Sequence, residues 1–183
     1  MPQEISEAIV LHGVDFSESS RIVTFLTPHR GRIACIAKGV RRKNSPMAAA
    51  LDTMNRVEAV YYWKDNRQVQ TLAEASVLDR YTPIKEDLAR SAFAMFILEI
   101  AGKIAHENEP SEDFFGAFVR GVTGLAAWPG EARMHACWQC WRLLAVAGFE
   151  EKQRRRGGGE TGTVPEGFVA TTNQTSEKPS KIA

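Results

Sequence analysis

The sequence predicts an α+β protein: a small five-stranded barrel, then a small α-helical domain, then a polar tail. Three observations lead to this prediction. Residues 1–80 form short segments rich in Val, Ile, Thr and aromatic residues, separated by polar turns. Residues 81–149 contain longer segments with apolar residues at helical spacing. Residues 150–183 are polar and Gly-rich without a periodic apolar face, so we expect a disordered tail.

Five segments of the first region have strand character, and the residues between them favour turns. The segments are Glu7–Phe16, Arg21–Thr27, Arg32–Lys38, Arg56–Trp63 and Gln68–Leu78. The polar stretch KDNR predicts a tight hairpin loop between the last two. The longer connection contains PMAAALDTM, for which we predict a short helix. Five strands with one longer connection are typical of the OB-fold barrel, whose relatives bind oligonucleotides.

The second region predicts three helices. Pro83–Glu107 is expected to be one central buried helix, because its apolar residues cover most of its circumference. A second helix should begin after Ser111, a typical N-cap residue. The third segment, EARMHACWQCWRLLAVAGF, repeats apolar residues at helical spacing, and Gly148 is expected to end it.

Composition and charge exclude several classes of protein. The formal net charge is only +1, so any electrostatic function must come from local charge. Three cysteines are too few for a disulfide scaffold and fit a reducing compartment. Glu4 and Glu7 stand where a signal peptide needs positive charge, and the apolar run Ser91–Leu98 is too short to span a bilayer. We therefore expect a cytoplasmic protein that does not enter a membrane.

Positive charge is concentrated in one window, since no Asp or Glu occurs between Glu18 and Asp52. Within it, strand alternation turns small apolar residues inward and leaves Arg32 and Lys38 on the other face, beside a basic loop. We predict that this window contacts nucleic-acid phosphates. The candidate residues are Arg21, Arg30, Arg32, Lys38, Arg41, Arg42 and Lys43. The alternative is a solvated strand end whose charges are satisfied by acids such as Asp52 or Glu58.

No pattern predicts an enzyme, a metal site or a cofactor. The sequence contains neither a GxSxG nucleophile motif nor a GxxxxGK[ST] phosphate loop. Cys137 and Cys140 lack the second cysteine pair that structural zinc usually requires, so both are interpreted as buried helix-packing residues. Tyr61 and Trp63 share one face of a strand and Tyr62 lies on the other, so at least one of these sets is core rather than a base-stacking surface.

The stretch AIVLHGVDFSESSRIVTFLTPHRGRIACIAKGVRRKNS, followed by LAEASVLDRY, resembles the N-terminal half of the RecO family. The shared features are an aromatic residue before an acidic and Ser-rich cluster (Phe16), a Thr-ended strand before a Gly turn (Thr27), a Lys-Gly-x-Arg-Arg element from Lys38, and a Leu-x-Glu strand from Leu72. The similarity is good over residues 8–99 and looser as far as residue 149.

The resemblance implies an OB domain followed by a helical domain in a non-enzymatic recombination mediator. Such a protein binds single- and double-stranded DNA, anneals complementary strands, and works with RecR and single-stranded-DNA-binding protein (SSB) to help load RecA. Many members carry a four-cysteine zinc site after the third helix. This sequence has RRRGGGETG there, so we expect a short member in which the zinc region is absent or replaced.

The resemblance also implies that the helical domain captures the acidic, Phe-ended tail of SSB. Capture needs an apolar slot for the ring and a cation for the carboxylates. Arg142 is the first candidate cation, because it follows Trp141 on a segment with few acids, and Arg133 is the second. Arg142 as an ordinary solvated helix residue is the alternative. A protein-interaction adaptor, with the barrel serving only as scaffold, remains the competing function.

Overall fold

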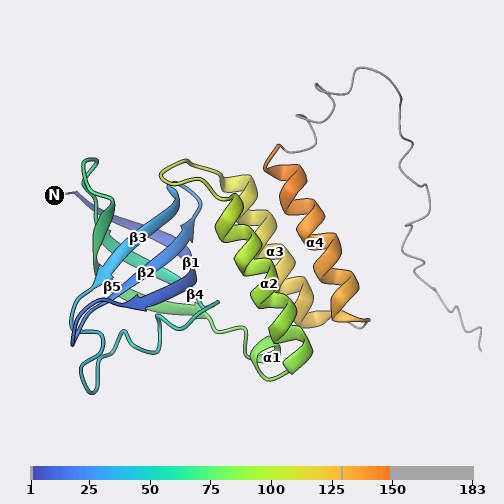
Figure 1. Cartoon of the computed structure of the whole chain (residues 1–183), viewed down its shortest axis with the longest axis horizontal. Helices are drawn as coiled ribbons and strands as arrows, with labels where there is room; N and C mark the ends of the chain where they lie inside the picture. Colours follow the sequence, from blue (N-terminus) through green and yellow to red (C-terminus); the bar gives the residue numbers. More distant parts are fainter. Residues whose placement is uncertain (1, 129, 149–183) are drawn as a thin grey trace, which may run out of the picture.

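The computed structural model describes residues 2–128 and 130–148, and the predicted tail lies outside them. Strands come first along the chain and helices follow, as Figure 1 shows. The strands are β1 (Gln3–Asp15), β2 (Arg21–Thr27), β3 (Gly31–Ala37), β4 (Arg56–Tyr62) and β5 (Val69–Asp79). The helices are α1 (Thr82–Lys85), α2 (Leu88–Ile104), α3 (Glu112–Ala127) and α4 (Ala132–Val146). The predicted α+β class is confirmed.

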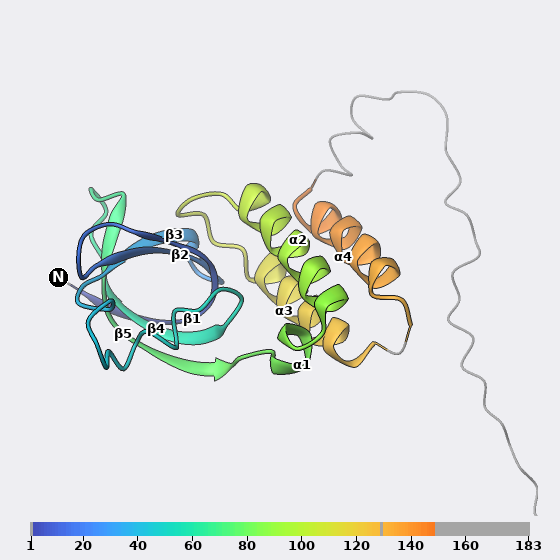
Figure 2. The same ribbon diagram turned by 60° about the horizontal axis from the view of Figure 1, so that its bottom comes forward.

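The five strands close into a barrel in the order β1-β2-β3-β5-β4, seen almost end-on in Figure 2. The β3–β5 pair is parallel and the other pairs are antiparallel. The long strand β1 pairs with β4 through Gln3–Ile9 and with β2 from Ile9 to Asp15. Along β3 the side chains of Ile33, Cys35 and Ala37 are buried in the barrel, whereas Arg32 is partly exposed, as alternation predicted.

The connection between β3 and β4 forms turns instead of the predicted short helix. Its hydrogen bonds are mostly of the tight i to i+3 kind, such as Ala50 N–H to the Met47 carbonyl, and one i to i+4 bond follows at Leu51. Val40, Ala50 and Leu51 are buried in the same apolar cluster as the barrel interior. Helical turns need several successive i to i+4 bonds, and here burial of these side chains decides the backbone path instead.

The predicted long helix is broken and is exposed on one side. The Asp87 carboxylate accepts the backbone N–H of Arg90 at 2.9 Å, which caps α2 and separates it from α1. Beyond Ile104 the chain leaves the helix to reach the barrel. Leu88 is 89% exposed and Phe96 is 54% exposed, so the prediction of a helix buried all round is wrong. An apolar circumference does not fix burial when only one side has neighbours.

The two remaining helices begin and end close to their predicted positions. Ser111 occupies the N-cap position of α3, but its side chain makes no capping hydrogen bond. Gly148 follows the end of α4 with a φ of 79°, a left-handed conformation that suits glycine. No helix in the described part of the chain is long and apolar enough to cross a membrane.

The barrel and the helices share a hydrophobic cluster. Ile9, Leu11 and Leu26, from the outer face of β1 and β2, belong to the same buried cluster as the helix residues. Main-chain bonds join the two parts as well: the Arg32 N–H donates to the His106 carbonyl at 3.0 Å. Gly31 has a φ of 58°, and a side chain there would collide with the carbonyl oxygens of His106 and Glu109.

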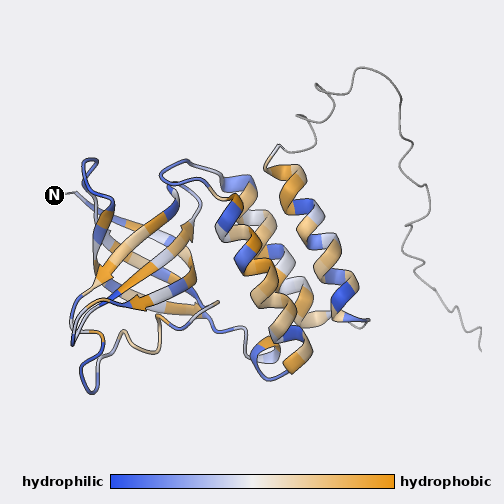
Figure 3. Ribbon diagram, viewed as in Figure 1, coloured by the Kyte–Doolittle hydropathy of each residue, from blue (hydrophilic) through white to orange (hydrophobic). Residues whose placement is uncertain are grey.

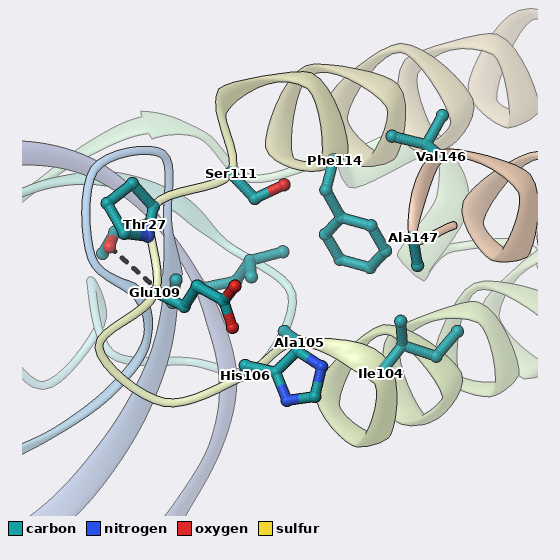
Figure 4. Close-up of a pocket in the computed structure, with 12 residues that line it drawn as sticks. Thr27, Ile104, Ala105, His106, Glu109, Ser111, Phe114, Val146 and Ala147 are labelled. Atoms are coloured by element: carbon teal, nitrogen blue, oxygen red, sulfur yellow. Dashed lines mark hydrogen bonds between the residues drawn. The ribbon is translucent and has the colours of Figure 1, made fainter. Parts of the chain in front are cut away.

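A pocket of about 220 Å³ lies at this junction, between the β2–β3 turn and the ends of α2 and α4 (Figure 4). Its lining includes Thr27, whose hydroxyl donates to the Gly31 carbonyl at 3.1 Å, together with His106 and Phe114. None of the seven basic residues predicted to contact nucleic acid lines this pocket.

Candidate nucleic-acid interface

Five of the seven predicted cations gather at one end of the barrel. Arg21 begins β2 and pairs in register with Ala37, the last residue of β3. Lys38 follows directly, and the others lie in the loop after it. The five are Arg21, Lys38, Arg41, Arg42 and Lys43. Antiparallel pairing of β2 with β3 therefore places the start of β2 beside the end of β3 and the loop that follows it.

Arg41 ties the β1–β2 loop to the β3–β4 loop. Its backbone N–H donates to the Ser19 carbonyl at 3.1 Å, and its Nη1 donates to the Ser17 carbonyl at 2.6 Å. Its Nε lies 3.3 Å from a carboxylate oxygen of Asp15. The same carboxylate accepts Nε of Arg21 at 3.1 Å. Asp15 thus holds two guanidinium groups close together at this end.

The local backbone explains why the next cations project outward. Val40 is buried and anchors the loop to the barrel, and Gly39 turns the chain with a φ of 72°. The Arg42 N–H closes the turn by donating to the Gly39 carbonyl at 3.1 Å. Arg42 and Lys43 then lie on the exposed tip, beyond the anchor. The loop that hangs from the barrel in Figure 3 has a hydrophilic tip.

The charge at this end is positive and partly uncompensated. Lys38, Arg42 and Lys43 are exposed and make no ion pair with any residue of the described ranges. The acids nearest in sequence are Asp15, the last residue of β1, and Glu18 in the β1–β2 loop, so the five cations outnumber these two carboxylates. A loop-borne cluster of this kind attracts polyanions.

Arg30 and Arg32 lie at the opposite end of the barrel and are held by the protein itself. Arg30 makes two bonds to the Glu4 carboxylate, at 2.6 and 3.2 Å, and its guanidinium stacks 4.2 Å from the centre of the Trp63 ring. The hydrogen bonds that Arg30 donates to the Glu4 carboxylate raise the pKa of Arg30. Arg32 donates to the Gly102 carbonyl at 2.6 Å and to Glu107 at 3.0 Å.

The seven candidates therefore do not form one cluster. β2 has seven residues, so its two ends are about 20 Å apart at about 3.3 Å per residue. The alternative of cations satisfied by distant acids describes Arg30 and Arg32 well, but the acids are Glu4 and Glu107, not Asp52 or Glu58. Asp52 instead binds Lys85, at 3.0 Å.

The aromatic and cysteine residues singled out from the sequence divide into buried and exposed sets. Tyr61 and Trp63 are buried and pack edge to face, which confirms that one aromatic set is core; Tyr62 lies on the outer face. Cys140 is buried as predicted, but Cys137 is exposed, so its prediction as a packing residue is wrong. No group of three or more possible metal ligands occurs within residues 2–128 and 130–148. The prediction of no stoichiometric zinc stays a prediction.

Helix α4 turns a different face inward from the one its apolar spacing suggested. The polar residues His135 and Gln139 are buried against α3, where His135 Nε2 lies 2.8 Å from the Gly121 carbonyl and Gln139 donates to the Ala117 carbonyl at 2.7 Å. Leu143 is buried with them, but four other large apolar residues of α4 are left about half exposed: Met134, Trp138, Trp141 and Leu144. The apolar spacing of this segment therefore did not predict an exposed apolar surface.

The two predicted partner-tail cations lie on this helix. The Arg142 guanidinium lies 4.6 Å from the centre of the Trp138 ring, a cation–π arrangement on the exposed side. Arg133 is exposed and pairs with Glu131 at 3.2 Å. Arg142 is thus positioned beside an exposed indole, whereas Arg133 is occupied by a neighbouring acid.

The family model and the curated proteins that match this chain carry the same family name. Residues 1–81 match the family model described as "Recombination protein O N terminal". The chain is 31% identical to the "DNA repair protein RecO" of Salinibacter ruber over 154 residues, which is 81% of this chain and 58% of that protein. It is 32% identical to the protein of the same name from Exiguobacterium sibiricum over 120 residues, covering 66% of this chain and 47% of the relative.

The chain spans about half the length of the curated relatives it matches. The match to the family model covers all five strands of the barrel, and the longer alignment continues into the helices. From this agreement between the barrel, the matched residues and the relatives, we conclude that residues 1–81 match the N-terminal region of the RecO family and that the chain is similar to RecO proteins beyond it.

Proposed function

We propose that this protein is a DNA-binding recombination mediator that acts in DNA repair and catalyses no chemical reaction. In this proposal it binds single- and double-stranded DNA, promotes annealing of complementary strands, and helps to load RecA in the cytoplasm. The curated relatives, named as DNA repair proteins, support the general role. The surface chemistry of the barrel supports the DNA-binding step.

The barrel supports the proposal through its architecture. We assign it as an OB-fold, because five strands close in the order β1-β2-β3-β5-β4 with a longer connection between β3 and β4. In OB-folds, the face of the second and third strands and the adjoining loops contact oligonucleotides. Here the β1–β2 loop and the basic β3–β4 loop meet beside that face, joined through Arg41.

The single observation that carries the proposal is the group of exposed, unpaired cations in the described part of this end: Lys38, Arg42 and Lys43. Side chains that are already paired must give up an acid before they bind a phosphate, but these three need not. Flexible Lys and Arg side chains neutralise phosphates without reading base sequence. Annealing brings two polyanions together, and local positive charge reduces their mutual repulsion.

A salt titration tests DNA binding directly. The affinity for a fluorescent single-stranded oligonucleotide should fall linearly on a log–log plot, with a slope that drops by about 0.7 for each phosphate contact removed. The variant Arg41→Glu/Arg42→Glu/Lys43→Glu should bind weakly and with a shallower slope. Since Arg41 also joins the two loops, Arg42→Glu/Lys43→Glu gives the cleaner result.

The matched control is Lys103→Glu/Arg120→Glu, which reverses two exposed cations on helices α2 and α3, outside the barrel. It makes the same change in net charge and should lower the affinity less. Equal slopes for the wild type and for Arg42→Glu/Lys43→Glu, both folded, would refute the assignment of this surface.

We further propose RecR and SSB as partners, with the SSB tail bound on α4. The exposed indoles of Trp138 and Trp141 offer contacts for an aromatic ring, and Arg142 beside Trp138 offers a cation for a carboxylate. A labelled acidic, Phe-ended peptide should bind the wild type and lose affinity with Arg142→Ala. Arg133→Ala should have a smaller effect, because Arg133 is paired with Glu131. Equal binding by wild type and Arg142→Ala would contradict this assignment.

The same exposed α4 surface supports the competing function, a protein-interaction adaptor in which the barrel is only scaffold. Retention on a column of immobilised single-stranded DNA separates the two functions. A DNA-binding mediator should be retained and then eluted by salt, whereas a pure adaptor should pass through at low salt.

A further inference from the structure

The β1–β2 loop begins with a large aromatic side chain in water. Phe16 is 63% exposed, and its backbone N–H donates to the Ser20 carbonyl at 3.0 Å, which continues the β1–β2 ladder by one step. The next residue, Ser17, gives its carbonyl to the Arg41 guanidinium. Phe16 is therefore held at the start of the basic end of the barrel.

An apolar row on the outer face of the barrel continues from Phe16. Val14 pairs in register with Ile22 of β2, and Ile22 pairs with Ile36 of β3. Directly paired residues point to the same side of a sheet, so these three side chains line up across three strands. Val14 is 61% exposed and the other two are partly exposed, so the row lies on the outside of the barrel.

The aromatic ring and the row lie next to cations. Lys38 follows Ile36 by two residues, and Arg21 precedes Ile22. A ligand that carries flat apolar groups on an anionic backbone would satisfy both kinds of surface at once. Single-stranded nucleic acid has this composition, whereas a duplex hides its bases inside the stack.

We propose that Phe16 is a base-stacking residue, and that unpaired bases lie on Phe16 and the Val14–Ile22–Ile36 row while their phosphates contact the adjacent cations. This inference rests on the proposed DNA binding and specifies its single-stranded form. Stacking on an aromatic ring tolerates any base, so this contact adds affinity without sequence preference. The cations alone would bind the phosphates of single strands and duplexes alike. Phe16 gives the site its preference for unpaired bases.

The test compares a thymidine oligonucleotide with an abasic oligonucleotide of equal length, whose sugar–phosphate backbone carries no bases. Wild type should bind the base-bearing strand about tenfold more tightly, the effect of one or two stacked bases. Phe16→Ala should lose most of this preference, keep the wild-type salt slope, and bind duplex DNA as the wild type does. Phe16→Trp should keep the preference, and its fluorescence should be quenched by the oligonucleotide.

Ile5→Ala is the matched control, because Ile5 is equally exposed on β1 but lies in the half that pairs with β4. It should behave as wild type. If Phe16→Ala keeps the full preference for the base-bearing strand, or wild type shows none, the stacking role is wrong and DNA binding through the cations stands. If wild type binds neither oligonucleotide, the proposed function fails together with this inference.

Discussion

Replacing Asp15 by asparagine should strengthen DNA binding. The Asp15 carboxylate binds Arg21 at 3.1 Å and Arg41 at 3.3 Å, so in the free protein it competes with phosphate for both guanidinium groups. Asp15→Asn keeps the size of the side chain and removes the charge. Arg41 retains its bond to the Ser17 carbonyl, so the loop should keep its position.

The expected size follows from the two ion pairs. The groups are all roughly 40–50% exposed, and partly exposed pairs are each worth at most about 1 kcal/mol. Releasing one guanidinium therefore raises the affinity by at most about fivefold, and releasing both by at most about thirtyfold. If both bind phosphate, the salt slope on single strands should steepen by up to about 1.4. Unfolding stability should fall by no more than about 2 kcal/mol, because both ion pairs are lost.

The assay is fluorescence anisotropy over a range of salt concentrations, with Glu18→Gln as the control. Glu18 lies in the same loop, is exposed, and has no ion pair with a described residue. Glu18→Gln removes the same charge without releasing a guanidinium, so it should raise the affinity modestly and leave the salt slope nearly unchanged. Weaker binding by Asp15→Asn, or identical slopes for the two variants, would refute this account.

Other expected outcomes concern stability, thiols, the tail and metal. Gly121→Ala should lower the free energy of unfolding by about 2 kcal/mol in urea, because the new methyl group would collide with the Gln139 amide. The double variant Gly121→Ala/Gln139→Ala should recover part of this free energy. Undiminished stability of the single variant would contradict the packing of α3 against α4. Burial raises the pKa of Cys35 from 9.0 to about 12, so between these two pH values only the unfolded protein loses the thiol proton. The free energy of unfolding should therefore fall as the pH rises through this range. It should fall less steeply in Cys35→Ala. Deleting residues 150–183 should leave the melting temperature nearly unchanged, and a large drop would show that part of this stretch packs on the rest. Elemental analysis should find no stoichiometric zinc; about one zinc per chain, with loss of helicity on chelation, would disprove this.

Features that depend on neighbouring residues were predictable from the sequence. The alternation in RIACIAK correctly separated the buried residues of β3 from Arg32, because a strand places successive side chains on opposite faces. The bounds of β2 were predicted to the residue, between a Ser cluster and a Pro-containing turn. The acid-free window also contains the three cations, Lys38, Arg42 and Lys43, that make no ion pair within the described residues.

Features that depend on long-range pairing were not predictable. Arg30 meets Glu4 and Arg32 meets Glu107 only because the barrel closes and the α2–α3 connection returns to it. No local pattern encodes these partners. The orientation of α4 was missed for a related reason. Its spacing offered several apolar faces, and the hydrogen bonds of His135 and Gln139 with α3 select a mixed face that also carries Ala136, Cys140 and Leu143.

The hydrophobic cluster shared by barrel and helices has a consequence for how the chain folds. Ile9, Leu11 and Leu26 are covered by helix side chains, although they belong to strands. A fragment ending after β5 would expose these three residues to water and lose roughly 1.5–3 kcal/mol for each. Melting the helices first would have the same cost. The barrel and the helices should therefore unfold in one cooperative step, with a single calorimetric peak whose van't Hoff and measured enthalpies agree.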